Sequence, residues 1–106
     1  MALPWITAVA NGHAARIGYE ADPCTRARKA TLESRGSRVV VTLYDTKRDP
    51  KKACVGIVER HCASFQMSER LGGQEFLDGA KHFRKRRELP IERFGPCVNV
   101  PVEQDW

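Results

Sequence analysis

The clearest alternation of apolar and polar positions falls in residues 37–44, SRVVVTLY. Val39, Val41 and Leu43 share one face of an extended chain, because successive side chains of a strand point to opposite sides. The segment is also rich in β-branched residues, which favour strands. We therefore predict a strand whose Val39, Val41 and Leu43 face packs on a core.

Two shorter apolar runs, residues 5–9 and 15–19, are separated by Asn11 and Gly12. Both of these residues tolerate positive φ, and the pair is typical of a two-residue hairpin turn. The sequence therefore predicts a hairpin near the N-terminus.

The next segment carries signals of a helix. Asp22 fits an N-cap, Pro23 fits the first helical position, and Gly36 stands where a helix would end. The apolar face between them is weak. We expect residues 22–36 to form a short surface helix or an ordered loop.

A charged stretch, residues 45–52, follows the predicted strand and contains an Asp-Pro pair typical of a turn. We expect it to join two antiparallel strands. The second of these is the extended run of residues 53–65, bent near Gly56 or broken around His61, because glycine within a strand often marks a bulge.

Residues 73–88 show a helical period instead. Apolar side chains recur there at three- and four-residue spacing and make one stripe: Phe76, Leu77, Ala80 and Phe83. Basic residues crowd the second half, where they complement the helix dipole. The pattern predicts an amphipathic helix.

The tail, residues 90–106, is punctuated by proline and is expected to be irregular, apart from an edge strand at residues 97–100. A chain of 106 residues can bury enough surface for one modest core. We therefore predict a single domain, residues 1–106, of class α+β. In this fold a small antiparallel sheet of three or more strands packs against a C-terminal amphipathic helix.

Charge adds a functional expectation. The chain has 18 Lys and Arg against 13 Asp and Glu, and a net charge of +5 attracts anionic partners. No apolar run approaches the roughly 18 residues that cross a bilayer. The N-terminus also lacks the basic start and continuous apolar core of a signal peptide. We expect a soluble, cytoplasmic protein without membrane contact.

Four cysteines stand without any C-x-x-C pair: Cys24, Cys54, Cys62 and Cys97. In a reducing cytoplasm they are most simply buried or idle thiols. A zinc site is a weaker alternative, because structural zinc usually draws its ligands in close pairs, and a disulfide such as Cys54 with Cys62 is another. No G-x-S-x-G, P-loop or H-E-x-x-H motif appears. The sequence predicts a non-enzymatic protein with no metal or other cofactor.

The run CASFQMSERLGGQEFLDGAKHFRKRREL, residues 62–89, resembles the last strand and helix of the ethylene-response-factor (Apetala) type DNA-binding domain and of phage integrase arm-binding domains. The matching residues are the strand aromatic Phe65, the turn glycines Gly72 and Gly73, the helix-face residues Phe76 and Ala80, and the helix arginine Arg84. The resemblance implies a three-stranded antiparallel sheet in the DNA major groove with the helix packed behind it.

In that arrangement the open face of the sheet reads bases with Arg38, Thr42, Tyr44, Arg60 and Ser64. We expect Lys47, Arg48, Lys51 and Lys52 of the turn to bind phosphates. Lys81, Arg84 and Lys85 of the helix are further candidates for flanking phosphates, although in the family-like geometry the helix sits away from the groove. Alternatively, Arg38 and Arg60 pair with Glu33 or Glu59.

The leading prediction is therefore binding of double-stranded DNA, as a regulatory or accessory factor of a phage or mobile element. Two other functions stay open. One is a phage-type inhibitor or adaptor that binds a host protein complex, and the other is an RNA-binding protein.

Overall fold

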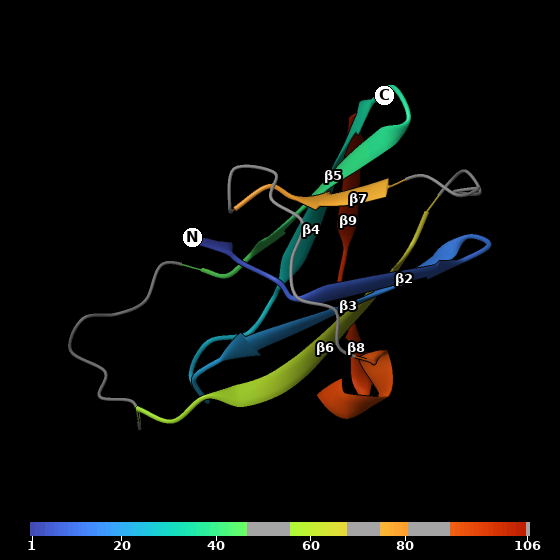
Figure 1. The fold of residues 1–106 in the computed structure, drawn as a ribbon. Coiled ribbons are helices and arrows are strands. Elements are labelled where there is room, and N and C mark those ends of the chain that lie inside the picture. The colour runs from blue at the N-terminus through green and yellow to red at the C-terminus, as the bar shows by residue number, and fades with distance from the viewer. Residues whose placement is uncertain (47–55, 68–74, 81–89, 106) are drawn as a thin grey trace.

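The computed structural model describes residues 1–46, 56–67, 75–80 and 90–105. These residues form two β-sheets and one short 3-10 helix (Figure 1). Sheet A contains β1 (Ala2–Leu3), β5 (Arg38–Tyr44), β4 (Lys29–Arg35) and β9 (Val102–Asp105) in this order, and β7 (Glu75–Asp78) also pairs with β5. Sheet B contains β2 (Thr7–Asn11), β3 (Ala14–Ala21), β6 (Glu59–Gln66) and β8 (Cys97–Asn99).

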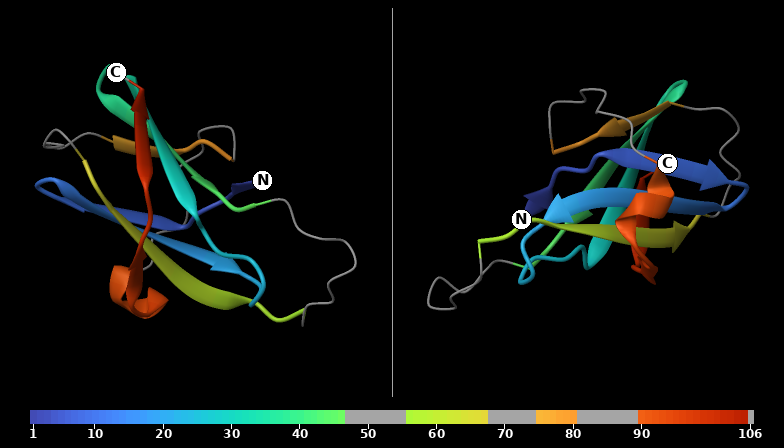
Figure 2. Two further views of the ribbon diagram at one scale, coloured as in Figure 1. Left: turned by 180° about the vertical axis from the view of Figure 1, so that it is seen from behind. Right: turned by 60° about the horizontal axis from the view of Figure 1, so that its bottom comes forward.

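The two sheets pack face to face around one apolar core, and Figure 2 shows their strands crossing. Sheet A contributes Leu32 and Val41, and sheet B contributes Ile17 and Phe65, all 0–2% exposed. Period-two alternation explains this core, because every second side chain of each strand points inward. The molecule is a β-sandwich, so the predicted α+β class is wrong.

Two sequence predictions are confirmed. The N-terminal hairpin is β2 and β3, joined at a turn where Gly12 has a φ of 67°. The alternating segment is β5, and its Val39, Val41 and Leu43 are fully buried. Both elements were predictable because a local turn signal and a local alternation specify them.

The prediction of a helix over residues 22–36 is wrong. Residues 29–35 form β4, which pairs antiparallel with β5 across a turn at Gly36, where φ is 68°. The glycine that suggested a helix end therefore serves a hairpin, which also requires positive φ. Ala30 and Leu32 are both 0% exposed, so the segment buries every second residue rather than a helical stripe.

The prediction of an amphipathic C-terminal helix is also wrong for the residues that the structure describes. Glu75–Asp78 is β7, which runs parallel to β5 and buries Leu77 and Asp78. Residues 81–89, the rest of the predicted helix, lie outside the described residues. A short apolar run does not distinguish strand from helix by itself, and pairing with β5 decides the matter.

The antiparallel sheet that was expected to join residues 37–44 to residues 53–65 is not formed. β5 belongs to sheet A and β6 belongs to sheet B, and the charged turn expected between them falls largely outside the described residues. Three pairings are parallel: β4 with β9, β5 with β7, and β6 with β8. Both sheets are therefore mixed.

Residues 90–105, expected as an irregular tail, carry the 3-10 helix η1 (Ile91–Phe94), β8 and β9. β8 lies where an edge strand was predicted. The helix covers the outer face of sheet B, where Phe94 and Ile91 pack with Ile6 and Cys62 in a second small apolar cluster. The described residues contain one helix, the four-residue η1, and it is too short to cross a membrane.

Candidate functional site

A pocket of about 420 Å³ opens at one end of the sandwich, between the first half of β6 and the connection from β3 to β4. We call it the β6-edge pocket. Its walls come from four stretches of the chain: Tyr19 with Pro23, Arg26 and Ala27; residues 59–63 of β6; residues 94–96 at the end of η1; and Val98 with Val100. A volume of this size is within the range of small-ligand sites.

The floor of the pocket is a stacked aromatic pair. The rings of Tyr19 and His61 lie 5.2 Å apart, with an angle of 22° between their planes. The Tyr19 hydroxyl accepts a hydrogen bond from the Ala27 N–H at 2.8 Å, which ties the β3–β4 connection to sheet B. Burial raises the pKa of Tyr19 above its ordinary value, against the opposing effect of that hydrogen bond, so the phenol stays neutral at physiological pH.

His61 lies beside Tyr19 in the pocket wall, and 24% of its side chain is exposed. Its Nε2 is buried and makes no hydrogen bond within the described part of the chain. The atom lies 3.8 Å from a carboxylate oxygen of Glu59, which is an ion pair only when the imidazole is protonated. This buried nitrogen therefore has hydrogen-bonding capacity that the described residues leave unused.

Two arginines border the pocket. The Arg26 side chain is exposed and forms no ion pair with a carboxylate among the described residues. The Arg60 guanidinium lies 3.7 Å from the carboxylate of Glu20, and 43% of its side chain is exposed. Arginine is suited to planar anions because it presents several N–H donors in one plane. Glu59 also lines the pocket, so its margin carries two arginines against one carboxylate around the Tyr19 and His61 rings.

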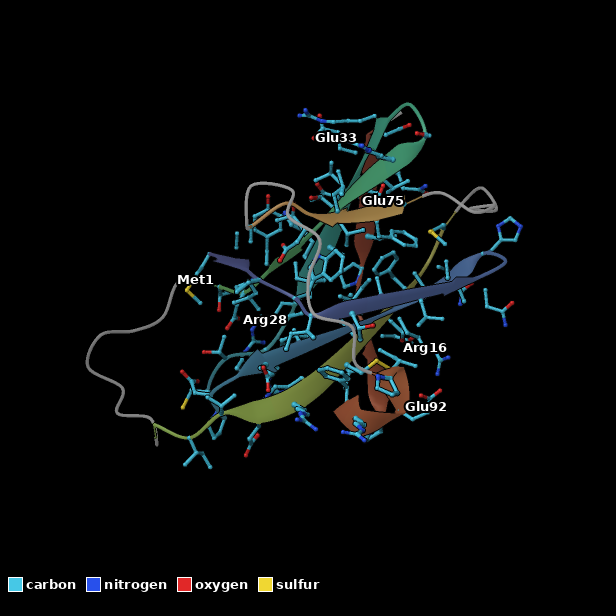
Figure 3. The ribbon with its side chains drawn as sticks, in the orientation of Figure 1. Met1, Arg16, Arg28, Glu33, Glu75 and Glu92 are labelled. Atoms are coloured by element: carbon cyan, nitrogen blue, oxygen red, sulfur yellow. A yellow bond between two sulfur atoms is a disulfide. The ribbon has the colours of Figure 1, made fainter. Side chains whose placement is uncertain are left out.

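A disulfide closes one side of the pocket. Cys62 of β6 is bonded to Cys97 of β8, and Figure 3 shows this bond in yellow next to η1. Cys24 is also disulfide-bonded, so the described cysteines are not the idle thiols that the sequence suggested. Since Cys62 is oxidised, it is neither a nucleophile nor a metal ligand. Within the described residues no group of three His, Cys, Asp or Glu side chains could hold a metal ion.

The residues expected to read DNA bases do not share one face. Arg38, Thr42 and Tyr44 are on sheet A, whereas Arg60 and Ser64 are on sheet B. Thr42 is 9% exposed, because the backbone of Gly79 lies against it and the Thr42 hydroxyl takes the space of a Gly79 Cβ. The other predicted site residues lie outside the described residues: Lys47, Arg48, Lys51, Lys52, Lys81, Arg84 and Lys85.

Three of the residues predicted to read DNA bases contact other residues of this chain. Arg38 lies 3.7 Å from Glu75, the Lys29 ammonium lies 5.5 Å from the centre of the Tyr44 ring, and the Ser64 hydroxyl donates to Asn99 at 2.6 Å. The two arginines do lie near acids, but the expected partners Glu33 and Glu59 are wrong. The acids are Glu75 and Glu20, both brought in by strand pairing rather than by nearness in sequence.

The positive charge of the chain is unevenly distributed. The described ranges hold eight of the 18 basic residues and ten of the 13 acidic ones, so they carry a net charge of −2. The overall charge of +5 therefore comes from the rest of the sequence, which contributes +7. The described part of the sandwich is not itself an electropositive surface.

Comparison of this chain with protein-family models, curated proteins and solved structures finds no match. Function is consequently argued from the pocket, because a sandwich fold by itself hosts many activities.

The pocket is not predictable from the sequence. Tyr19, Arg26, His61 and Val98 are up to 79 positions apart, and no local motif links them. One signal was present: His61 occupies the same alternating register as Ala63 and Phe65, which places a polar ring on the core side of its strand.

Proposed function

We propose that this protein is a non-enzymatic binding domain that holds an anionic, partly apolar group in the β6-edge pocket. The observation that carries the proposal is the combination of the stacked Tyr19 and His61 rings with the guanidinium groups of Arg26 and Arg60 around one pocket. An apolar body with a carboxylate would bury its carbon atoms on the rings and leave its charge near the arginines.

We also propose that the domain works in an oxidising compartment. The disulfide between Cys62 and Cys97 and the oxidised state of Cys24 support this, because disulfides persist mainly outside the reducing cytoplasm. This departs from the cytoplasmic location expected from the sequence. Quantifying free thiols in protein freshly isolated from its native cells, with alkylation before lysis, tests the proposal. Free Cys62 and Cys97 thiols would contradict it.

Binding is tested by titrating 3-methylbutanoate into ¹⁵N-labelled protein with its disulfides intact. We expect chemical-shift changes at His61 and Val98, and weaker binding of the neutral amide of the same acid. Arg26→Gln should weaken carboxylate binding about three-fold, in keeping with a solvent-exposed ion pair of about 0.6 kcal/mol.

Arg16→Gln is the matched control, because Arg16 is an exposed arginine of β3 that does not line the pocket. Figure 3 shows Arg16 well apart from Arg28, which is close in sequence to Arg26. Val98→Trp should block the pocket without cost to the core, since Val98 is 65% exposed. The proposal is wrong if the probes leave the pocket residues unchanged, or if Arg16→Gln weakens binding as much as Arg26→Gln.

Nucleic-acid binding is a second proposal, supported by the net charge of +5 rather than by the sandwich. A labelled duplex titrated at two salt concentrations tests it. If about five phosphates are neutralised, the log-log slope against salt should be roughly −4 to −5. Absence of binding at low salt would contradict this second proposal without affecting the proposal of ligand binding in the pocket. Competition between duplex DNA and single-stranded RNA distinguishes the two nucleic acids.

A further inference from the structure

One edge of β6 is only half covered within the described part of the chain. β3 pairs with the opposite edge over all of Glu59–Gln66. β8 pairs only with residues 62–64, so residues 59–61 have no described strand on that side. At β5 of sheet A, by contrast, the outer edge pairs with β7 over residues 38–41 and with β1 at residues 43 and 44.

The hydrogen bonds identify which backbone groups face this open edge. The Ser64 carbonyl accepts from the Val100 N–H at 2.8 Å, so Ser64 directs its backbone polar groups toward β8. These groups alternate in direction from residue to residue, so Cys62 and Arg60 direct theirs the same way. Gly18 of β3 lies opposite Cys62, and its carbonyl accepts from the Ile6 N–H at 2.8 Å on the β2 side. The backbone groups of Gly18 therefore point away from β6, as expected if those of Cys62 point toward β8.

Arg60 lies beyond the start of β8 and therefore presents one N–H and one C=O to the open edge. The β6-edge pocket lies against the same edge, since it is lined both by residues 59–61 and by residues 95–98 except Cys97. β2 and β9 are also outer strands, but they contribute no residue to this pocket. The β6 edge thus combines exposed backbone donors and acceptors with an adjacent side-chain pocket.

Resting on the proposed function, we propose that the ligand is an extended peptide segment of another protein, which adds to β6 as a short strand. Its backbone pairs with the N–H and C=O of Arg60, and an apolar side chain enters the pocket over His61. Strand addition of this kind takes affinity from main-chain hydrogen bonds and specificity from the pocket.

Charge determines the kind of partner. The pocket is lined by two arginines, Arg26 and Arg60, and one acid, Glu59. Arg60 already lies 3.7 Å from Glu20, so Arg26 is the guanidinium that a carboxylate of the added segment would pair with. A second copy of this chain is a poorer occupant, because antiparallel pairing of two β6 edges about Arg60 places two arginines opposite each other, which is unfavourable. The structure therefore points to an acidic, apolar segment of a different protein.

The experiment uses three capped peptides and the full chain with intact disulfides. The first peptide alternates valine and aspartate over five residues, the second replaces aspartate by lysine, and the third is the first with every amide N-methylated. We expect the first to shift the Arg60 amide and slow its hydrogen exchange. The lysine peptide and the N-methylated peptide should each bind about five- to ten-fold more weakly, the loss expected for one hydrogen bond or ion contact.

Two variants separate the backbone from the side chain. Arg60→Ala removes the guanidinium but keeps the N–H, whereas Arg60→Pro removes both, and proline is tolerated where a strand N–H faces an open edge. We expect Arg60→Pro to bind the valine–aspartate peptide at least five-fold more weakly than Arg60→Ala. The N-methylated peptide, used with the unaltered protein, keeps the test valid if Arg60→Pro does not fold.

Strand addition is overturned if the N-methylated peptide binds as tightly as its parent, or if the two Arg60 variants bind equally. Self-association through Arg60, detected by sedimentation, would overturn the choice of partner. If 3-methylbutanoate still shifts His61 in these cases, the proposed function stands and only this inference fails. If 3-methylbutanoate also leaves His61 unchanged, the proposed function fails as well.

Discussion

Substitution of Gly18 by alanine tests how η1 is attached to sheet B. Gly18 lies on the outer face of β3, and the Phe94 ring packs directly on it. A Cβ at position 18 would stand 2.7–2.9 Å from three atoms of that ring, closer than real contacts allow. Phe94 is 1% exposed and is held by Ile6, Ile91 and Cys62, so the ring cannot move away without opening the cluster.

The expected loss follows from two opposing effects. Forcing extra volume into a packed cluster costs about 1–3 kcal/mol. Replacing glycine restricts the unfolded chain, which returns about 0.4–1 kcal/mol. Gly18→Ala should therefore lower the free energy of unfolding by about 1–2 kcal/mol, and lower the melting temperature by about 4–8 °C for each kcal/mol lost.

Urea unfolding followed by the fluorescence of the buried Trp5 measures the effect, with the disulfides kept intact. Gly56→Ala is the matched control, because a Cβ there meets no atom within 4 Å and no positive φ is involved. We expect the control to change stability by less than about 0.5 kcal/mol. If Gly18→Ala is as stable as Gly56→Ala, the described contact between Phe94 and Gly18 is wrong.

Three further outcomes are expected. Burial by itself raises the pKa of Asp45, but hydrogen bonds from the Arg26 N–H, the Arg28 guanidinium and the Thr46 N–H outweigh it and hold the pKa below its ordinary value. Its stabilising effect is thus present above the unfolded-state pKa and is lost as the pH falls through the folded-state pKa, so Asp45→Asn should flatten the acid limb of a plot of unfolding free energy against pH. Replacing both Cys62 and Cys97 by serine should cost about 3–4 kcal/mol for a bridge that spans 35 positions, measured by urea unfolding, and an unchanged midpoint would contradict this bond. Asp78→Ala should cost about 2–5 kcal/mol in the same assay, because the buried carboxylate accepts from the Trp5 and Ala80 N–H groups; Asp78→Asn, which keeps one acceptor oxygen, should cost less, and equal losses would show that these acceptors do not matter.

Part of the fold could be predicted because its signals are local. The glycine of the hairpin turn, which the structure places at Gly12-His13, and the alternation of β5 each specify their element within a few residues. β4 and β7 were misassigned because their residues fit a helical period as well as an alternating one, and strand pairing with β5 decides between the two. Sequence patterns describe one segment at a time, whereas a sheet is stabilised by residues far apart in the chain.

The candidate site also depends on contacts between residues far apart in the sequence. Arg60 was predicted to face DNA, and the structure instead places it 3.7 Å from Glu20, which lies 40 positions away and was not predictable. The cysteines give a second example: their spacing excluded close pairs, yet β6 and β8 bring Cys62 next to Cys97. Spacing alone carries no information about which strands become neighbours.

The amino-acid sequence alone determined the net charge, the N-terminal hairpin and the buried face of β5, because composition and short-range periodicity are sufficient for each. Only the tertiary structure decided that two mixed sheets enclose the core, that Tyr19 stacks on His61, and that β6 keeps a half-open edge beside a pocket. These features depend on which distant segments pair, and the free energy of that pairing is shared among many residues rather than encoded in any one motif.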